Sequence, residues 1–199
     1  WYSTVIVCNP SLPFNDLQGL ISYAKKNPGK LSMATAGPGS GNHFSSELLA
    51  SMAGLQVTHI PYKGNAPATQ DVMAGVASCI HIGEAKPYID SGRLKPIATT
   101  GLKRDPRFPD LKTVDEQGLR GYDITWWQGI FAPAGTPPAI VEKLSAVARK
   151  VAEDPQVKTV MFDAGFVPEF VPPAELTARM QRDMAKFRKI AQEAKLEFD

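Results

Sequence analysis

Cysteine, histidine and excess charge are all scarce in this chain, and each shortage excludes a class of protein. The 199 residues include two cysteines and three histidines, with no CxxC, HxH or HExxH spacing. A zinc finger, a thioredoxin-type redox site and a zinc protease are therefore not expected. The net charge is +2 and the basic residues are dispersed, so the chain lacks the basic patch that binding to nucleic acid requires.

Long apolar runs are also missing, and no stretch reaches the length of a membrane span. Direct membrane insertion is therefore not expected. Hydrophobic residues make up 43% of the chain and charged residues 21%, which suits one large or two small globular cores. Residues 1–4 lack the features of a secretory signal, and the chain opens without methionine almost directly into a strand pattern. This opening indicates a processed protein or a fragment.

The two cysteines, Cys8 and Cys79, each lie within an apolar run. The simpler interpretation is a pair of small buried hydrophobic side chains. A disulfide is the alternative if the protein resides in an oxidising compartment.

Short β-type runs alternate with helical periods over the first hundred residues. Asn15 is expected to cap the first helix, and Asn65 is positioned to cap a later one. The alternation predicts an α/β fold with a mostly parallel sheet and helices on both faces. The expected strands are residues 3–8, 31–35, 57–60, 78–82 and 96–100.

The pattern changes after residue 101, where a charged, proline-rich connection leads to an aromatic run, Trp126 to Phe131. These aromatic side chains could form a binding platform or pack between lobes, and we interpret the run as a strand crossing from one lobe to the other. Three helices follow, with one further strand expected at residues 166–171. Because so few strands cannot form an independent α/β core, we expect one complete lobe at residues 1–122 and part of another at 123–199.

A glycine-rich loop, Gly37 to His43, lies between an expected strand and an expected helix. Glycines expose backbone N–H groups, and a helix N-terminus adds unpaired donors and a positive dipole end, so the loop favours an anion such as a carboxylate. A tight strand-to-helix turn with no ligand is the alternative. The phosphate-binding GK[ST] and GxGxxG patterns are both absent. A second helix start, near Asn65, follows a neighbouring strand and could converge on the same ligand.

The histidines and Ser40 offer weaker signals. His43 could hydrogen-bond a ligand or brace the loop, whereas His59 and His81 are expected to be strand residues with satisfied hydrogen bonds. No metal site is expected from their spacing. Ser40 lies outside any GxSxG elbow, and no base is assigned to it by spacing.

Several motifs together resemble one protein family along the whole chain. The most specific pairing is His59-Ile-Pro-Tyr-Lys-Gly64 with Pro67-Ala68, joined to the later Ala132-Pro-Ala-Gly-Thr-Pro137. Further matches are Asn27-Pro-Gly-Lys-Leu31, Ala36-Gly-Pro-Gly-Ser40, Gly92-Arg-Leu-Lys-Pro96 and Trp127-Gln-Gly129. In order and spacing the chain resembles the Bug/TctC substrate-binding proteins of tripartite tricarboxylate transporters.

The resemblance implies a type II periplasmic-binding-protein (Venus-flytrap) architecture and a periplasmic location. Such a receptor captures a small carboxylate and delivers it to membrane transporter subunits, without a cofactor or catalytic residues. The ligand would be a di- or tricarboxylate, an acidic amino acid or an aromatic acid. The expected ligand-binding residues are Gly37, Gly39, Ser40, Asn42, His43, Tyr62, Lys63, Asn65, Ala66 and Thr69.

One departure from the family pattern is that its signal peptide and first carboxylate loop are absent, and Trp1 aligns near the start of the second lobe. Two other functions stay open on the sequence. The first is an enzyme, a hydrolase or transferase that uses Ser40 or His43. The second is a sensory or partner-binding module built on the same fold.

Overall fold

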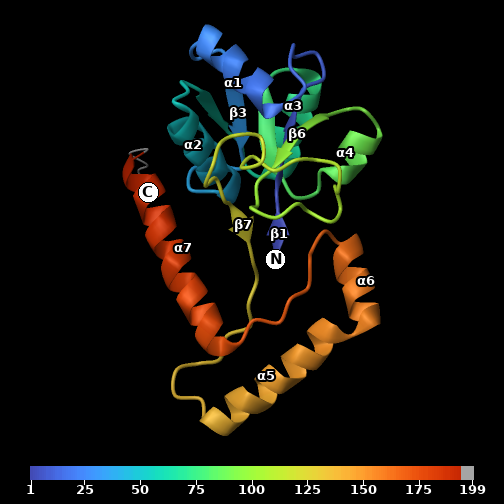
Figure 1. The fold of residues 1–199 in the computed structure, drawn as a ribbon, viewed down its shortest axis with the longest axis vertical. Coiled ribbons are helices and arrows are strands. Elements are labelled where there is room, and N and C mark those ends of the chain that lie inside the picture. The colour runs from blue at the N-terminus through green and yellow to red at the C-terminus, as the bar shows by residue number, and fades with distance from the viewer. Residues whose placement is uncertain (194–199) are drawn as a thin grey trace. The chain divides into compact units, whose positions relative to one another are not determined.

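The computed structural model describes residues 1–193, and the chain divides into two compact units (Figure 1). The first, here called the sheet unit, contains Ser3–Thr125 and, among the described residues, 187–193. The second, here called the helical unit, contains Trp1–Tyr2 and Trp126–Lys186. The chain therefore passes between the units three times.

A five-stranded mixed sheet forms the centre of the sheet unit. Its strand order is β4-β3-β5-β2-β6, and β3 pairs in parallel with both β4 and β5. β2 runs antiparallel to β5 and to β6, so the expectation of a mostly parallel sheet misses one reversed central strand. The strands are β2 (Val5–Cys8), β3 (Ser32–Thr35), β4 (Thr58–Pro61), β5 (Cys79–Ile82) and β6 (Lys95–Thr99).

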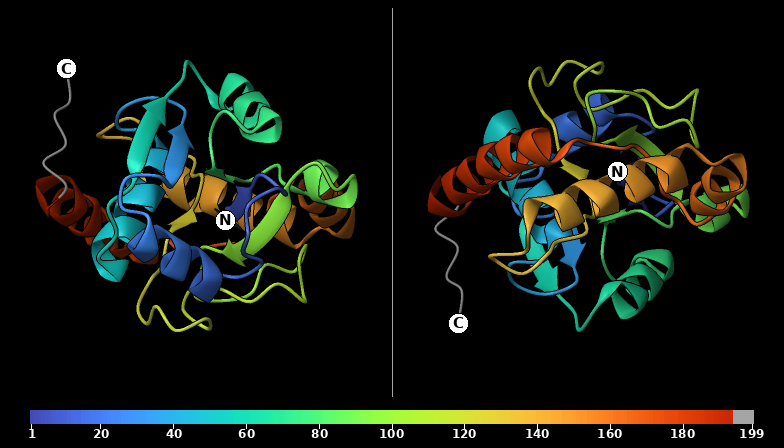
Figure 2. Two further views of the ribbon diagram at one scale, coloured as in Figure 1. Left: turned by 90° about the horizontal axis from the view of Figure 1, so that it is seen from above. Right: turned by 90° about the horizontal axis from the view of Figure 1, so that it is seen from below.

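Helices cover both faces of this sheet. Ala68 and Val72 of α3 pack with Ala34 and Ile80 in one apolar cluster. Ile60 of β4 packs against this cluster. Because side chains alternate along a strand, the neighbouring His59 lies on the opposite face of the sheet, where it contacts Glu47 of α2. Figure 2 shows α2 and α3 on different sides of the strands. The helices are α1 (Leu17–Lys26), α2 (Gly41–Ala53), α3 (Asn65–Ala74) and α4 (Lys86–Asp90).

Two helix caps differ from the sequence-based expectation. Asp16, and not Asn15, caps α1, since its carboxylate accepts the Gly19 N–H at 2.7 Å. Asn15 instead accepts a hydrogen bond from the Lys95 ammonium. Asn65 is the first residue of α3 and Gly64 occupies the cap position, with φ of 111°. A residue without Cβ adopts that angle most readily. The helix therefore begins one residue earlier in the chain than a cap at Asn65 would give.

Cys8 and Cys79 form a disulfide between the neighbouring strands β2 and β5. The interpretation of two free buried cysteines is therefore wrong. Both residues are fully buried, and the bond closes a loop with a sequence separation of 71. The two apolar runs are distant in sequence but adjacent in the sheet, and neither run alone predicts that pairing.

A buried ion pair fixes the start of the sheet unit. Asp105 is fully buried and accepts hydrogen bonds from Ser3 Oγ at 2.8 Å and from Arg107 Nη2 at 2.7 Å. Arg107 also donates to the carbonyl oxygens of Gly83 and Ser3. Burial acts to raise the pKa of Asp105, but the hydrogen bonds from Arg107 and Ser3 outweigh it and lower that pKa. Asp105 is therefore a charged, fully hydrogen-bonded core residue.

The helical unit contains α5 (Pro138–Glu153), α6 (Pro155–Asp163) and most of α7 (Pro173–Glu193). Residues 166–171 form no strand, which corrects the expectation, although the backbone of Val167 exchanges two hydrogen bonds with Trp1. Two short strands, β1 (Tyr2–Ser3) and β7 (Thr125–Trp126), pair where the chain leaves each unit. Within residues 1–193, no helix combines the length and apolarity that crossing a membrane requires.

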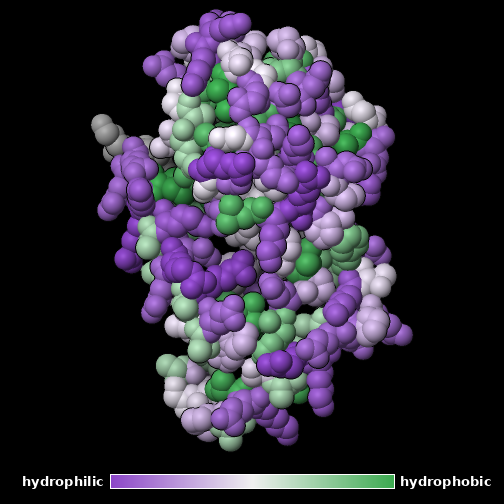
Figure 3. Space-filling view, in the orientation of Figure 1, coloured by the Kyte–Doolittle hydropathy of each residue, from purple (hydrophilic) through white to green (hydrophobic). Residues whose placement is uncertain are grey.

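The apolar stripe of α5 is largely uncovered. Figure 3 shows hydrophobic side chains at the surface in the region of α5. Four apolar residues of α5 are about half exposed: Ile140 50%, Leu144 52%, Val147 51% and Val151 49%. Neither α5 nor α6 contains a buried residue.

Candidate functional site

Two helix N-termini meet at one edge of the sheet. α2 follows β3 and α3 follows β4, and these parallel strands are direct neighbours. The Asn42 side-chain amide donates to Asn65 Oδ1 at 2.9 Å, which joins the first turns of the two helices. The Gly64 N–H donates to the Ala36 carbonyl, so the loops that precede the helices are also joined.

The loop before α2 is held by its own side chains. Asn42 is buried, and its Oδ1 accepts the Ala36 N–H at 3.0 Å and lies 2.7 Å from Ser40 Oγ. Gly37 has φ of 123° and Gly39 has φ of 69°, angles that a residue with a Cβ rarely adopts. The two glycines therefore give the loop a shape that other residues would strain.

This arrangement suits an anion. The first N–H groups of a helix have no acceptor within the helix, and the positive dipole end adds to their attraction for negative charge. α2 and α3 each supply such a first turn, and no acidic residue occupies either turn. A carboxylate at this edge would meet N–H donors and no charged competitor from these turns.

The predicted ligand-binding residues differ in their contacts and in their exposure. Gly37, Gly39, Ser40, Asn42 and His43 lie together in the loop and the first turn of α2, and Asn65 is joined to them. Tyr62 instead donates its hydroxyl to Asp71 of α3 at 2.8 Å, and burial raises the pKa of this phenol. Thr69 is buried at 3% exposure, whereas Lys63 and Ala66 are exposed. Ligand contact by any of these residues remains a prediction.

Sequence reasoning missed a side-chain cluster behind the loop. Glu47 Oε1 lies 3.5 Å from His43 Nε2 and 3.1 Å from His59 Nε2. The hydrogen bond from His43 is the main cause that lowers the pKa of Glu47, against the opposing effect of burial. Burial lowers the pKa of His59. His43 and Glu47 share one face of α2, four residues apart, and that spacing was the one signal available.

The expectation of satisfied histidines on the strands is wrong in part. His81 is buried, and neither of its ring nitrogens has a hydrogen-bond partner among the described residues. Burial lowers its pKa to about 3, so it is neutral in the folded protein at ordinary pH. His59 uses Nε2 but leaves Nδ1 without a partner in the described part of the chain.

His43, Glu47 and His59 are also the residues that could hold a metal ion. One ligand atom from each lies within 4.8 Å of the others. Two imidazoles and a carboxylate form a donor set found at zinc and iron sites. No HxH or HExxH spacing marks this set in the sequence, because His59 comes from β4 whereas His43 and Glu47 lie on α2.

Ser40 is not arranged as a nucleophile. Its hydroxyl lies 2.6 Å from the Gly37 carbonyl oxygen and 2.7 Å from Asn42 Oδ1, and neither atom is a base. The nearby His43 Nδ1 already accepts the Gly39 N–H at 3.2 Å. A serine without a base in hydrogen-bond reach lacks the activation that acyl transfer requires.

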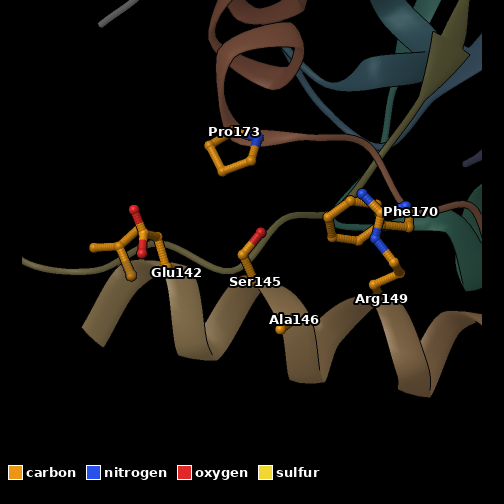
Figure 4. Close-up of a pocket in the computed structure, with 7 residues that line it drawn as sticks. Glu142, Ser145, Ala146, Arg149, Phe170 and Pro173 are labelled. Atoms are coloured by element: carbon orange, nitrogen blue, oxygen red, sulfur yellow. The ribbon is translucent and has the colours of Figure 1, made fainter. Parts of the chain in front are cut away.

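A separate cavity of about 310 Å³ lies in the helical unit (Figure 4). Arg149 of α5 stacks over the Phe170 ring at 4.4 Å, and Glu142, Ser145 and Pro173 also line the cavity. It is lined by α5 and by the segment that leads into α7.

Trp127, considered above as a binding platform, instead donates its indole N–H to Asp183 at 2.8 Å.

Comparison with known proteins identifies the family. The model of a family described as "Tripartite tricarboxylate transporter family receptor", TctC, matches residues 1–196. A UPF0065 protein from the tcbD-tcbE intergenic region of Pseudomonas sp. (strain P51) is 33% identical over 196 residues, which is 97% of this chain. This chain spans 58% of the length of that relative.

Solved structures give the same fold. The R. palustris protein Rpa4515 with adipate superposes with a TM-score of 0.86 at 29% identity, covering 98% of this chain and 66% of that one. The periplasmic binding protein BugD superposes with a TM-score of 0.80 at 32% identity, covering 98% and 67%. These matches confirm the expected periplasmic-binding-protein architecture, represented here by one lobe and part of the other. A receptor family also agrees with the expectation that the chain is not an enzyme. On these grounds the chain belongs to the TctC family of tripartite tricarboxylate transporter receptors.

Proposed function

We propose that this chain supplies one half of the ligand-binding cleft of a periplasmic receptor that captures a small carboxylate for a tripartite transporter. The observation that carries the proposal is the junction of two helix N-termini, α2 and α3, through the hydrogen bond between Asn42 and Asn65. Two first turns that meet at the carboxyl ends of adjacent parallel strands offer several N–H donors to one anion.

The ligand class follows from the same donors and from a solved relative. Backbone N–H groups and short polar side chains recognise a carboxylate group without selecting the rest of the molecule. Rpa4515, which has the same fold, was solved with adipate, a dicarboxylate. A dicarboxylate is therefore the first candidate, with the second carboxylate held outside the loops of the sheet unit.

A periplasmic location is supported by the disulfide. A buried bond between Cys8 and Cys79 persists in an oxidising compartment and is rare in the reducing cytosol. BugD is described as a periplasmic binding protein. Delivery to membrane transporter subunits is proposed from the family alone.

We also propose that the helical unit belongs to a second lobe whose sheet needs strands that residues 1–193 do not supply. Residues 187–193 pack with the sheet unit, so the proposed lobe does not extend over the whole expected range of 123–199. The half-exposed stripe of α5 supports this, because an amphipathic helix normally packs that face on a core. The boundary near residue 122 remains part of this proposal.

The test is a calorimetric titration with adipate, succinate, malate, citrate and glutamate, and with 1,4-diaminobutane as a cation of similar length. It uses the longest form that the gene encodes, with residues 1–199 in parallel. At least one carboxylate should bind and be recovered unchanged, and the diamine should not. Binding of the diamine alone, or turnover of the acid, would contradict the proposal.

Ser40→Ala should weaken carboxylate binding about three- to tenfold without unfolding the protein, because the loop loses one internal hydrogen bond. Ser51→Ala is the matched control, since Ser51 is exposed at the other end of α2. Equal affinities for the two variants would remove Ser40 from the site.

A further inference from the structure

The cluster behind the loop contains two imidazoles that share one carboxylate. Glu47 Oε1 faces His43 Nε2 and His59 Nε2, and the two rings meet edge to face with centroids 5.0 Å apart. The three side chains are only 13–19% exposed. The cluster is therefore screened from solvent and lies directly against the first turn of α2.

The proton on His43 can be assigned from its partners. The Gly39 N–H donates to His43 Nδ1 at 3.2 Å, and a backbone N–H cannot accept. Nδ1 must therefore carry a lone pair, and a neutral imidazole then holds its proton on Nε2, which faces Glu47. Hydrogen bonding from His43 lowers the pKa of Glu47, which is consistent with an ionised acceptor at that position.

A metal ion fits this arrangement less well than a proton does. Metal binding at His43 Nε2 would move the ring proton to Nδ1. Two donors, Nδ1–H and the Gly39 N–H, would then face each other without an acceptor. A ligating histidine normally donates its other N–H to an acceptor. His59 Nδ1 is buried and has no such acceptor within residues 1–193. The surroundings of Nδ1 in His43 and in His59 therefore favour neutral rings whose Nε2–H groups donate to Glu47.

We infer that Glu47 is a positioning residue for the glycine-rich loop. It holds His43 in the Nε2–H tautomer, so that Nδ1 stays available to the Gly39 N–H and the loop is fixed before any ligand arrives. His59 is the second donor, and it anchors Glu47 to β4. The role in binding rests on the proposed carboxylate site, where a loop that is already ordered loses less conformational entropy on binding. The tautomer itself can be tested without ligand.

The test compares Glu47→Leu, which removes the acceptor, with Glu47→Gln, which keeps an acceptor oxygen of similar reach. Asp183→Leu is the control for losing a partly buried carboxylate, since Asp183 is 19% exposed, accepts the Trp127 indole N–H and lies in the helical unit. Nitrogen-15 NMR of the histidine rings, near pH 8 and without ligand, reports which nitrogen carries the proton. Hydrogen exchange of the Gly39 amide reports the loop.

We expect the wild-type His43 proton on Nε2, and a mixture of tautomers in Glu47→Leu. The Gly39 amide should exchange about tenfold faster in Glu47→Leu and within about twofold of wild type in Glu47→Gln and Asp183→Leu. Adipate should bind about tenfold more weakly to Glu47→Leu than to wild type, which corresponds to about 1.4 kcal/mol.

Three results would overturn the inference: a wild-type His43 proton on Nδ1, unchanged Gly39 exchange in Glu47→Leu, or binding of added Zn²⁺ that shifts both histidine rings and is lost in Glu47→Gln. If adipate fails to bind wild type while the tautomer and exchange results hold, the failure lies with the proposed ligand and not with the role of Glu47.

Discussion

The sheet unit and the helical unit contain helices with comparable apolar patterning but bury it to different extents. In the sheet unit, Leu17 and Leu20 of α1 and Leu49 of α2 are at most 1% exposed. In the helical unit, Leu144 and Val147 of α5 are about half exposed, in a stripe of equally regular spacing. Amphipathic periodicity therefore predicts which face a helix would bury, while burial itself depends on packing partners such as the five-stranded sheet of the sheet unit.

The tryptophans make this comparison measurable. All three, Trp1, Trp126 and Trp127, belong to the helical unit, and all three histidines and both cysteines belong to the sheet unit. Tryptophan fluorescence consequently reports the unfolding of the helical unit. Amide hydrogen exchange in β2 and β5 reports the sheet unit.

The largest effect is expected from Asp105→Ala. Removing the carboxylate leaves the Arg107 guanidinium, which is only 7% exposed, without its counter-charge, and such losses cost about 3–5 kcal/mol. The unfolding free energy from exchange in β2 and β5 should fall by that amount. Arg120→Ala, at a side chain that is 76% exposed, is the control and should change stability far less. Similar costs for the two variants would mean that the buried pair does not anchor the sheet unit.

The disulfide should contribute the next largest amount. The double variant Cys8→Ala/Cys79→Ala should destabilise the sheet unit by about 2–4 kcal/mol, because the unfolded chain regains the freedom of a long loop. Urea unfolding followed by exchange should show this loss, while the midpoint seen by tryptophan fluorescence stays close to wild type. Equal shifts of both signals would show that the two units unfold as one, and the comparison would no longer hold.

A pair of leucine variants tests the comparison directly. Leu49→Ala removes a side chain that is 1% exposed and should cost about 3 kcal/mol, whereas Leu144→Ala should cost less than about 1 kcal/mol. Both are measured by urea unfolding of residues 1–199. In the longest form that the gene encodes, Leu144→Ala should become costlier if further strands cover α5. An unchanged small cost in that form would contradict the proposed second lobe.

These differences also explain what the sequence could and could not predict. All five strands of the main sheet were placed to within about two residues, because each is a short apolar run bounded by turn residues. The reversed direction of β2 and the bond between Cys8 and Cys79 were not foreseen. Both depend on which strands become neighbours, and pairing between distant segments leaves no local pattern.

For the candidate site, only the local geometry can be compared with the sequence, and ligand contact stays a prediction. The loop and the first turn of α2 could be found because glycines and a helix start are local signals. Glu47 could not be assigned a role, since its partner His59 lies twelve residues further on, on a different element. The same limit applies to Tyr62, whose hydroxyl contacts Asp71, nine residues further along the chain.

The smallest effect is expected from pH, through His81. Its pKa is about 3 in the folded protein and about 6.5 when exposed, so at pH below 6.5 the unfolded chain binds a proton that the folded chain does not. Stability of the sheet unit should therefore fall as the pH drops from 6.5 toward 3, by about 2 kcal/mol at pH 5. The lowered pKa of His59 acts in the same direction. His81→Leu removes the first contribution, so its stability relative to wild type should rise by about 2 kcal/mol between pH 7.5 and 5. Carboxylates such as Asp105 titrate equally in both proteins and cancel in this difference. If the stability difference between His81→Leu and wild type does not vary with pH, His81 must be protonated in the folded state as readily as in the unfolded state. The buried ring would then need a hydrogen-bond acceptor.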